Sequence, residues 1–169
     1  MTQPPLSEWA PHEAVWIGFP SDPELWLGDL KPAEREVAAF ASAVHAGGKG
    51  ETVRLVAAHD GAAESAQELC PFAEVIVEPF GDIWLRDTGP IVLGGGRARR
   101  AQGFGFNGWG GKYELEGDQD IGARLAKAAT SRSAGFRSPN HSSGSLGKPI
   151  HTASCGAHSG SGGCVMRGG

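Results

Sequence analysis

The sequence holds 169 residues, 40% of them hydrophobic, with a formal net charge of −4. This length suits one domain or about one and a half at ~100–150 residues each, and the acidic balance offers no basic surface to nucleic acid or an anionic membrane. No apolar run reaches the ~18 residues of a membrane span, and the first residues lack the pattern of a signal peptide. Three cysteines without a secretory signal fit a reducing compartment, so we expect a cytoplasmic protein without nucleic-acid or membrane partners.

Charge and composition change abruptly near residue 129. All 19 acidic residues lie in residues 1–129, which carry a charge of −8, whereas residues 130–169 contain no acid and carry a charge of +4. That second segment holds nine glycines and nine serines, and it can bury too little apolar surface to offset the entropy of ordering the chain. We therefore predict a folded part in 1–129 and a disordered Gly/Ser-rich tail in 130–169.

Hydrophobic periodicity and turn residues predict a mixed order of helices and strands. Strands are expected at 14–19, 52–57, 73–77, 91–93 and 97–106, a tight turn at 94–96, and helices at 32–46, 60–69 and 118–129. In the first helix Pro32 suits the first position, and the predicted buried stripe is Val37, Phe40, Ala41 and Val44. In the last helix Ile121, Leu125 and Ala128 share one face. The order fits neither a strictly parallel doubly wound sheet nor an all-β protein, and it predicts an α/β or α+β fold.

The chemistry of the chain is concentrated in the stretch Phe80-Gly-Asp-Ile-Trp-Leu-Arg-Asp-Thr-Gly-Pro90. Ile83 and Leu85 alternate with polar or aromatic residues, which predicts a short, half-buried strand that ends near Asp87. A carboxylate there can accept paired N–H bonds from a planar cation such as a guanidinium. The indole of Trp84 could offer that cation an aromatic face.

Two other interpretations of the same stretch stay open. Asp-Thr-Gly-Pro is also an ordinary turn in which the Asp87 side chain bonds the backbone N–H groups that follow it, and Asp82 and Arg86 could form a surface ion pair. In a regular strand Trp84 and Asp87 would point to opposite faces. A shared pocket therefore requires a bulge or the strand end.

The sequence context of the other candidate residues mostly indicates structural roles. Cys70 lies before Pro71 without a nearby base to lower its pKa, so we interpret it as a small buried hydrophobic residue. His59 is expected to cap or pack, and His12 is a weak candidate for substrate contact. Residues 103–108 match G-x-G-x-x-G, but the apolar start of a helix that a dinucleotide site requires does not follow.

Three segments together resemble agmatine deiminase, of the Porphyromonas-type branch of the peptidyl-arginine deiminase superfamily. They are Glu8-Trp-Ala-Pro-His-Glu-Ala-Val-Trp-Ile-Gly-Phe-Pro20, Asp82-Ile-Trp-Leu-Arg-Asp-Thr-Gly-Pro90 and Phe106-Asn-Gly-Trp-Gly-Gly-Lys-Tyr113. The resemblance implies a partial pentein β/α-propeller built of ββαβ-type modules. It also implies hydrolysis of agmatine, a small guanidinium substrate, to N-carbamoylputrescine and ammonia in putrescine biosynthesis, with no metal or organic cofactor. A homo-oligomer stays open.

The resemblance also assigns site residues. Asp87 corresponds to the first carboxylate that grips the guanidinium, and Trp84 is its aromatic neighbour. Asn107, Trp109 and Trp9 are expected near the pocket as substrate-binding residues without an assigned chemical step. In the family mechanism a cysteine thiolate attacks the guanidinium carbon, ammonia leaves, water resolves the intermediate and a histidine handles protons.

The sequence departs from the family after residue 129. It contains neither a Glu-Gly-Gly-x-x-His-x-Asp-Gly segment nor a Gly-Gly-x-x-His-Cys segment, so no catalytic residue is assigned and His151, Cys155 and Cys164 receive no role. The abrupt change in composition is typical of translation in a shifted frame. A set of four metal ligands, His151, Cys155, His158 and Cys164, fits none of the common zinc spacings, so we expect no metal. Two alternatives to an active deiminase remain: a non-catalytic guanidine-binding module, and an inactive fragment with unpaired strand edges.

Overall fold

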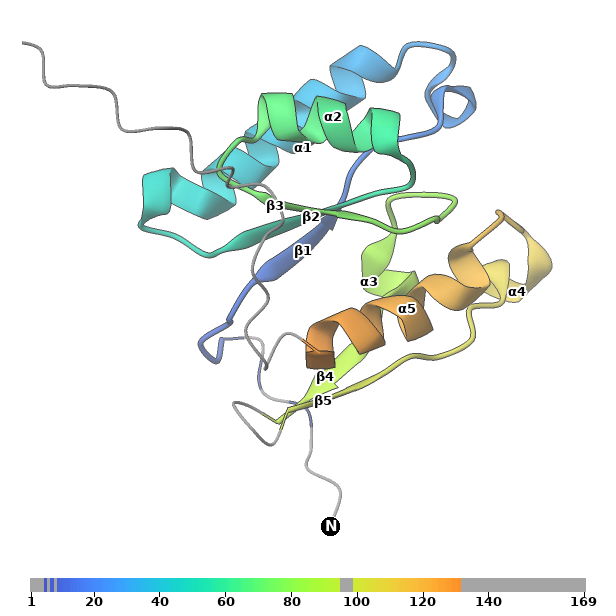
Figure 1. Cartoon of the computed structure of the whole chain (residues 1–169). Coiled ribbons are helices and arrows are strands. Elements are labelled where there is room, and N and C mark those ends of the chain that lie inside the picture. The colour runs from blue at the N-terminus through green and yellow to red at the C-terminus, as the bar shows by residue number, and fades with distance from the viewer. Residues whose placement is uncertain (1–4, 6, 8, 95–98, 132–169) are drawn as a thin grey trace, which may run out of the picture. The chain divides into compact units, whose positions relative to one another are not determined.

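The computed structural model describes residues 5, 7, 9–94 and 99–131, all of which belong to one compact unit, residues 1–136 (Figure 1). In chain order the elements are β1 (Val15–Gly18), the 3-10 helix η1 (Pro23–Trp26), α1 (Leu30–His45), the 3-10 helix η2 (Ala46–Gly48), β2 (Val53–Ala57), α2 (Asp60–Leu69), β3 (Glu74–Val77), α3 (Leu85–Thr88), β4 (Ile91–Leu93), β5 (Arg100–Gln102), α4 (Gly108–Gly111) and α5 (Asp118–Ser131). None of the helices in this described part combines the length and apolar content that crossing a membrane requires.

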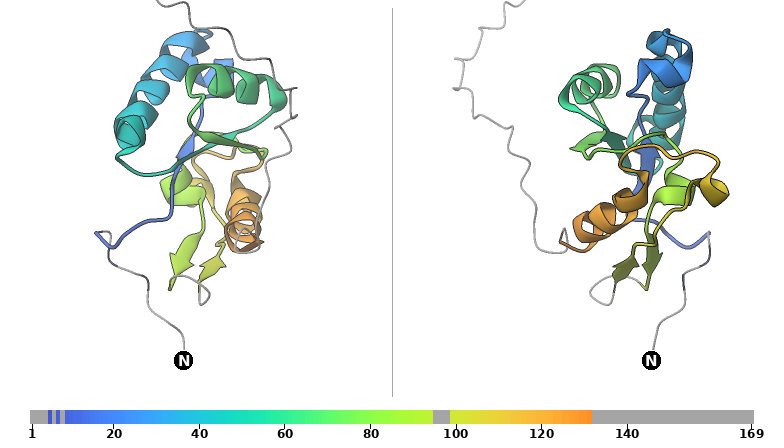
Figure 2. Two further views of the ribbon diagram at one scale, coloured as in Figure 1. Left: turned by 60° about the vertical axis from the view of Figure 1, so that its left-hand side comes forward. Right: turned by 90° about the vertical axis from the view of Figure 1, so that its right-hand side faces the viewer.

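The first half of the fold is a three-stranded parallel sheet in the order β1-β2-β3. Val15 is opposite Val53 and Leu55 is opposite Val75 in its register. Helices α1 and α2 connect the strands and lie together on one face of the sheet (Figures 1 and 2). Parallel strands need such crossovers, because each strand must return to the same end of the sheet before the next begins.

The central strand β2 is buried on both faces and joins two apolar cores. Val53, Leu55 and Ala57 pack with the alanines of α1 and α2. Val56, which points to the other face, packs with Phe80 and with residues of α5. The alternation of side chains along a strand explains this division, and full burial of one such side chain contributes about 1.5–3 kcal/mol.

Helix α1 confirms the predicted helix but corrects its start and its buried stripe. It begins at Leu30, so Pro32 is not the first helical residue. Phe40, predicted to be buried, is 57% exposed, whereas Ala38 and Ala41 are buried. Small alanine side chains allow the helix to lie close to the sheet, and this centres the contact on Ala38 and Ala41 and leaves Phe40 beside it.

The second half contains the antiparallel hairpin β4–β5, which pairs Leu93 with Arg100, and helix α5. The returning strand, predicted at 97–106, ends at Gln102, because α5 packs directly on the residue that follows it. A Cβ added at Gly103 would lie 2.6 Å from the backbone nitrogen of Ala123. The predicted turn at 94–96 lies largely outside the described residues.

The predicted apolar face of α5 is confirmed for its two large residues. Ile121 and Leu125 are fully buried. Ala129 is also buried, whereas the predicted Ala128 is half-buried. The helix runs to Ser131, beyond the predicted end at Ala129.

Candidate functional site

A hollow of about 550 Å³ lies beside the chemistry-rich stretch of the sequence. Its walls come from η1, from the segment 82–87, from α4 and from the loop before α5. The lining residues are Leu25, Asp82, Trp84, Asp87, Trp109, Tyr113 and Leu115. The structure therefore brings three of the predicted site residues, Asp87, Trp84 and Trp109, to one hollow.

The strand predicted through Ile83 and Leu85 is wrong, because this segment forms the single helical turn α3. The Trp84 carbonyl accepts the backbone N–H groups of Asp87 at 2.9 Å and of Thr88 at 3.0 Å, together with the Thr88 hydroxyl at 3.1 Å. Ile83 and Leu85 both pack against the second core, as they could in an extended strand, so the hydrogen bonds to the Trp84 carbonyl are what define the turn.

This helical turn explains how Trp84 and Asp87 share a pocket. Residues i and i+3 are neighbours on a helix surface, whereas a regular strand would have turned the two side chains to opposite faces. Both residues line the hollow. One turn of helix thus brings the two side chains together, where the sequence pattern had required a bulge or the end of a strand.

The Asp87 carboxylate is exposed and accepts no hydrogen bond from the described residues. The alternative in which it bonds the amides that follow it is therefore not observed. The carboxylate that does bond a following amide is that of Asp82, which accepts the Ile83 N–H at 2.7 Å. The oxygens of Asp87 thus remain available to a ligand in the hollow.

A cluster of aromatic rings lies at the hollow, with Trp109 at its centre. Its ring meets those of Trp84, Phe106 and Tyr113 edge to face, at centroid distances of 6.2, 4.8 and 6.0 Å. Such edge-to-face pairs each add about 0.5–1.5 kcal/mol beyond area burial. The rings therefore support one another even though Trp84 and Trp109 are 52% and 45% exposed.

Trp109 reaches this position through a left-handed turn. Residues Gly108 to Gly111 have φ values of 62°, 52°, 82° and 79°, a region that residues with a Cβ rarely adopt. The Asn107 side chain caps the turn, since its Oδ1 accepts the Gly110 N–H at 3.1 Å. Asn107 thus lies next to the hollow without lining it.

The predicted substrate-binding residue Trp9 is not part of this group, because it is 87% exposed and does not line the hollow. Conversely, Leu25, Tyr113 and Leu115 line the hollow without having been singled out. Tyr113 closes the third motif, which could have indicated it. Leu25 reaches the hollow from a distant part of the chain and carries no sequence signal.

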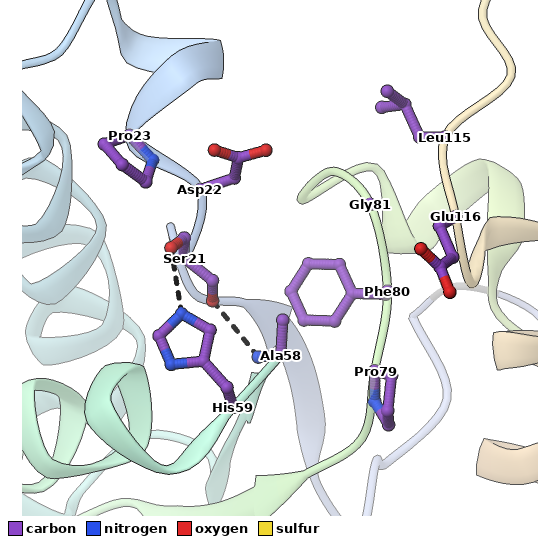
Figure 3. A pocket seen from close by; sticks show the side chains of 10 residues that line it. All are labelled: Ser21, Asp22, Pro23, Ala58, His59, Pro79, Phe80, Gly81, Leu115 and Glu116. Carbon is purple, nitrogen blue, oxygen red and sulfur yellow. Dashed lines mark hydrogen bonds between the residues drawn. The ribbon is translucent and has the colours of Figure 1, made fainter.

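A second hollow of about 430 Å³ lies at the carboxyl ends of the three parallel strands (Figure 3). Several of its polar side chains bond to the protein itself. The His59 Nδ1 accepts the Ala62 N–H at 3.2 Å, so Nε2 carries the proton donated to the Ser21 carbonyl at 3.1 Å. The Ser21 hydroxyl bonds the Phe19 carbonyl and the Ala58 N–H. The predicted capping role of His59 is confirmed.

Two other predicted residues are also placed by the structure. Cys70 is completely buried in the core between the sheet and α1–α2, and burial raises the pKa of its thiol above the ordinary 9.0. The interpretation of Cys70 as a buried hydrophobic residue is confirmed. His12 Nδ1 lies 3.1 Å from a carboxylate oxygen of Glu51, away from the hollow of Asp87.

Metal ligation was the remaining possibility raised for the sequence. No group of three or more His, Cys, Asp or Glu side chains that could hold a metal ion occurs among residues 5, 7, 9–94 and 99–131. The four tail residues considered as ligands, His151, Cys155, His158 and Cys164, lie outside the described residues.

Comparison with known proteins decides the family. The sequence pattern of the Porphyromonas-type peptidyl-arginine deiminases matches residues 5–155. The chain belongs to this family. The resemblance drawn from the three motifs is confirmed, and the match extends past residue 129 into the Gly/Ser-rich segment.

Individual members of the deiminase family are considerably longer than the part that this chain matches. The agmatine deiminase of Stutzerimonas stutzeri is 36% identical over 109 residues, which are 63% of this chain and 28% of the relative. That of Pseudomonas aeruginosa is 37% identical over 108 residues, or 62% and 28%. A cysteine-to-serine variant of C. jejuni agmatine deiminase with substrate bound superimposes with a TM-score of 0.61 at 25% identity, covering 75% of this chain and 37% of that one. The chain spans about a third of the length of these relatives.

Proposed function

We propose that this chain carries the guanidinium-binding part of an agmatine-deiminase-type hydrolase. The observation that supports the proposal is the Asp87 carboxylate, which accepts no hydrogen bond from the described residues and lines a hollow walled by Trp84 and Trp109. A guanidinium is planar and offers paired N–H donors to a carboxylate, and indole rings attract such a cation. Agmatine combines this head with a flexible aliphatic stem that can lie along aromatic rings.

The proposed reaction of the complete enzyme type is hydrolysis of agmatine to N-carbamoylputrescine and ammonia. Asp87 would hold the guanidinium so that its carbon faces a thiolate, which attacks before ammonia leaves and water resolves the intermediate. A fixed anion opposite a fixed cation needs no proton transfer, and it contributes by orienting the reacting carbon. The relatives named agmatine deiminase support this substrate.

Turnover by the 169-residue chain itself is not expected. Cys70, the cysteine within the described residues, is fully buried in the other core, and its raised pKa disfavours the thiolate that attacks. Binding the ground state alone does not lower the barrier to reaction. The geometry therefore also supports a second candidate function, a non-catalytic guanidine-binding module.

The finer assignments follow from the family and are part of the same proposal. We place the sheet β1-β2-β3 and the unit β4–β5–α5 in a pentein β/α-propeller, and the reaction in putrescine biosynthesis. We also retain the hypothesis that residues 130–169 are translated in a shifted frame. The nucleotide sequence around codon 129, in all three frames, tests this last point by showing whether a Glu-Gly-Gly-x-x-His segment is restored.

Calorimetry with agmatine and putrescine tests the binding function. Putrescine has the same stem and a second ammonium group but no guanidinium, so the protein should bind agmatine about tenfold tighter, a difference of ~1.4 kcal/mol. Asp87→Asn should weaken agmatine binding by about the same factor or more. The matched control is Asp60→Asn, which neutralises an exposed carboxylate at the start of α2. It should leave agmatine binding unchanged. Agmatine binding that survives Asp87→Asn unchanged would remove Asp87 as the anchor.

An assay for ammonia separates the two candidate functions. The purified chain is expected to release no ammonia from agmatine above a buffer control. Robust turnover that is abolished by Asp87→Ala would show instead that the chain is a complete catalyst.

A further inference from the structure

Asp82 lies in the wall of the same hollow, and its carboxylate is engaged by the protein on both oxygens. Oδ2 accepts the indole Nε1–H of Trp84 at 2.8 Å, and Oδ1 accepts the Ile83 N–H at 2.7 Å. A hydrogen bond with a charged acceptor is roughly twice as strong as a neutral one. The indole of Trp84 is thus tied at its nitrogen to a residue two positions earlier in the chain.

This bond matters because the Trp84 ring is 52% exposed. A half-exposed indole on a loop can occupy several staggered rotamers, and only some of them keep the ring in the wall of the hollow. Two contacts restrict it: the hydrogen bond to Asp82, and the edge-to-face packing against Trp109 at 6.2 Å. Of these two contacts, the hydrogen bond to Asp82 fixes the nitrogen end of the ring.

The segment that carries Asp82 is itself anchored to α5. Asp118, in the first turn of that helix, is 3% exposed, and its Oδ1 accepts the N–H groups of Gly81 at 2.8 Å and of Asp82 at 3.4 Å. The approach is close, since a Cβ added at Gly81 would lie 3.2 Å from Oδ2 of Asp118. Asp82 is therefore held from a rigid helix.

The helical turn that carries Asp87 starts at Trp84, whose indole is bonded to Asp82. The Trp84 carbonyl accepts the backbone N–H of Asp87 at 2.9 Å. A series of hydrogen bonds therefore runs from the buried Asp118 through Asp82 to Trp84 and on to the backbone of Asp87. The ring and the carboxylate of the hollow share this one support.

We infer that Asp82 is a positioning residue for guanidinium binding, which acts by holding the Trp84 indole in the wall of the hollow beside Asp87. This role rests on the proposed function, because it assigns Asp82 to the same ligand. It gives Asp82 a purpose other than the surface ion pair with Arg86 considered from the sequence. The charge of Asp82 is directed to the protein's own N–H groups, whereas that of Asp87 is left for the ligand.

A double-mutant cycle with agmatine as the calorimetric probe tests this role. Asp82→Ala removes the acceptor, and Trp84→Phe removes the indole N–H but keeps an aromatic ring. Each is expected to weaken agmatine binding about three- to tenfold, the range for loss of one hydrogen bond. In the Trp84→Phe background, Asp82→Ala should cause little further loss, because the hydrogen bond that it removes is already absent. Full additivity of the two effects would overturn the inference.

A nuclear magnetic resonance signal reports the hydrogen bond directly. The indole N–H signal of Trp84 is identified as the one that Trp84→Phe abolishes. It is expected to shift and to exchange faster with solvent in Asp82→Ala, and to stay in place in Asp87→Asn, which nevertheless weakens binding. An indole signal unchanged by Asp82→Ala would overturn the inference, whatever happens to affinity.

The outcomes separate the inference from the function on which it rests. If the wild-type chain does not bind agmatine, the proposed function falls, and the role of Asp82 in binding falls with it. If the wild type binds and Asp82→Ala binds equally well, the inference alone is wrong. Should Asp82→Ala fail to fold by circular dichroism, Trp84→Phe removes the same bond, and wild-type affinity in that variant would overturn the inference.

Discussion

The two halves of the described chain are held together by different forces. The sheet β1-β2-β3 with α1 and α2 is held by apolar burial, with Phe19, Leu55 and Ala66 fully inaccessible to solvent. The segment 80–117, which forms most of the hollow, exposes several large aromatic residues, including Trp84 and Trp109. Its shape depends on carboxylates that accept backbone N–H groups and on a turn with positive φ.

This difference separates stability from site geometry. Burial is non-directional and scales with apolar area, so the first half tolerates conservative changes of shape. Hydrogen bonds and left-handed backbone are directional, and a single substitution can move a side chain without unfolding the protein. Variants in the two halves should therefore be distinguishable by whether they change stability, agmatine binding or both.

The largest expected effect is on stability and comes from the first half. Leu55→Ala, in the middle of β2, should lower the free energy of unfolding by about 2–5 kcal/mol, because it leaves a cavity where the core is fully buried. Urea denaturation measures this change. Phe40→Ala on α1 is the control, since Phe40 is 57% exposed, and it should cost about 0.5 kcal/mol or less. Equal losses in the two variants would contradict the assignment of the core.

An intermediate effect is expected from the left-handed turn that places Trp109. Gly108 has a φ of 62°, and a Cβ there would lie 2.1 Å from the carbonyl oxygen of Tyr113. Gly108→Ala should therefore cost about 1–3 kcal/mol of stability and should weaken agmatine binding as well. The matched control is Gly105→Ala, where an added Cβ meets nothing within 4 Å. Agmatine affinity unaffected by Gly108→Ala would mean that the turn does not shape the binding site.

The smallest effect is a pH dependence at Asp118, which anchors Gly81 and Asp82 to α5. Burial raises the pKa of Asp118 above its ordinary 3.8, while the N–H groups of Gly81 and Asp82 partly oppose the shift. The folded state then holds the proton more tightly than the unfolded state, so this contribution to stability is present below pH 3.8 and is lost as the pH rises through the raised pKa.

Comparison of the wild type with Asp118→Asn isolates that contribution, because every other titrating group is common to both. The difference in their free energies of unfolding, from urea titrations between about pH 3 and pH 7, should move against the wild type as the pH rises and then level off. A difference that moves in favour of the wild type over this range would show that the pKa of Asp118 is lowered by folding.

Much of the first half could be predicted because its signals are local. Alternation of apolar residues and the flanking glycines and prolines located β1, β2, β3 and α2 to within one residue at each end. The exposed Phe40 could not be predicted, since the choice between neighbouring stripes of α1 depends on how closely the helix approaches the sheet. That distance is set by alanines that contact strands far away in the sequence.

The site was only partly predictable. Resemblance to the family pointed to Asp87, Trp84 and Trp109, and the structure places all three around one hollow. The prediction of a strand at 83–85 was wrong because the apolar pair Ile83 and Leu85 is compatible with both an extended and a bent backbone. The bent form is held by the hydrogen bonds to the Trp84 carbonyl and by Asp118, which binds the N–H groups of Gly81 and Asp82 from α5, and no local pattern encodes that long-range contact.

The sequence by itself indicated Asp87, Trp84 and Trp109 as candidate site residues and located most of the strands and helices, because residue type and periodicity act over a few neighbouring positions. Only the tertiary structure decided that Asp87 and Trp84 line the same hollow and that Trp9 does not. It also decided that Asp118 bonds the backbone next to Asp82, which in turn bonds Trp84. These outcomes depend on contacts between segments distant in the chain, and packing and hydrogen bonding choose among local conformations of nearly equal energy.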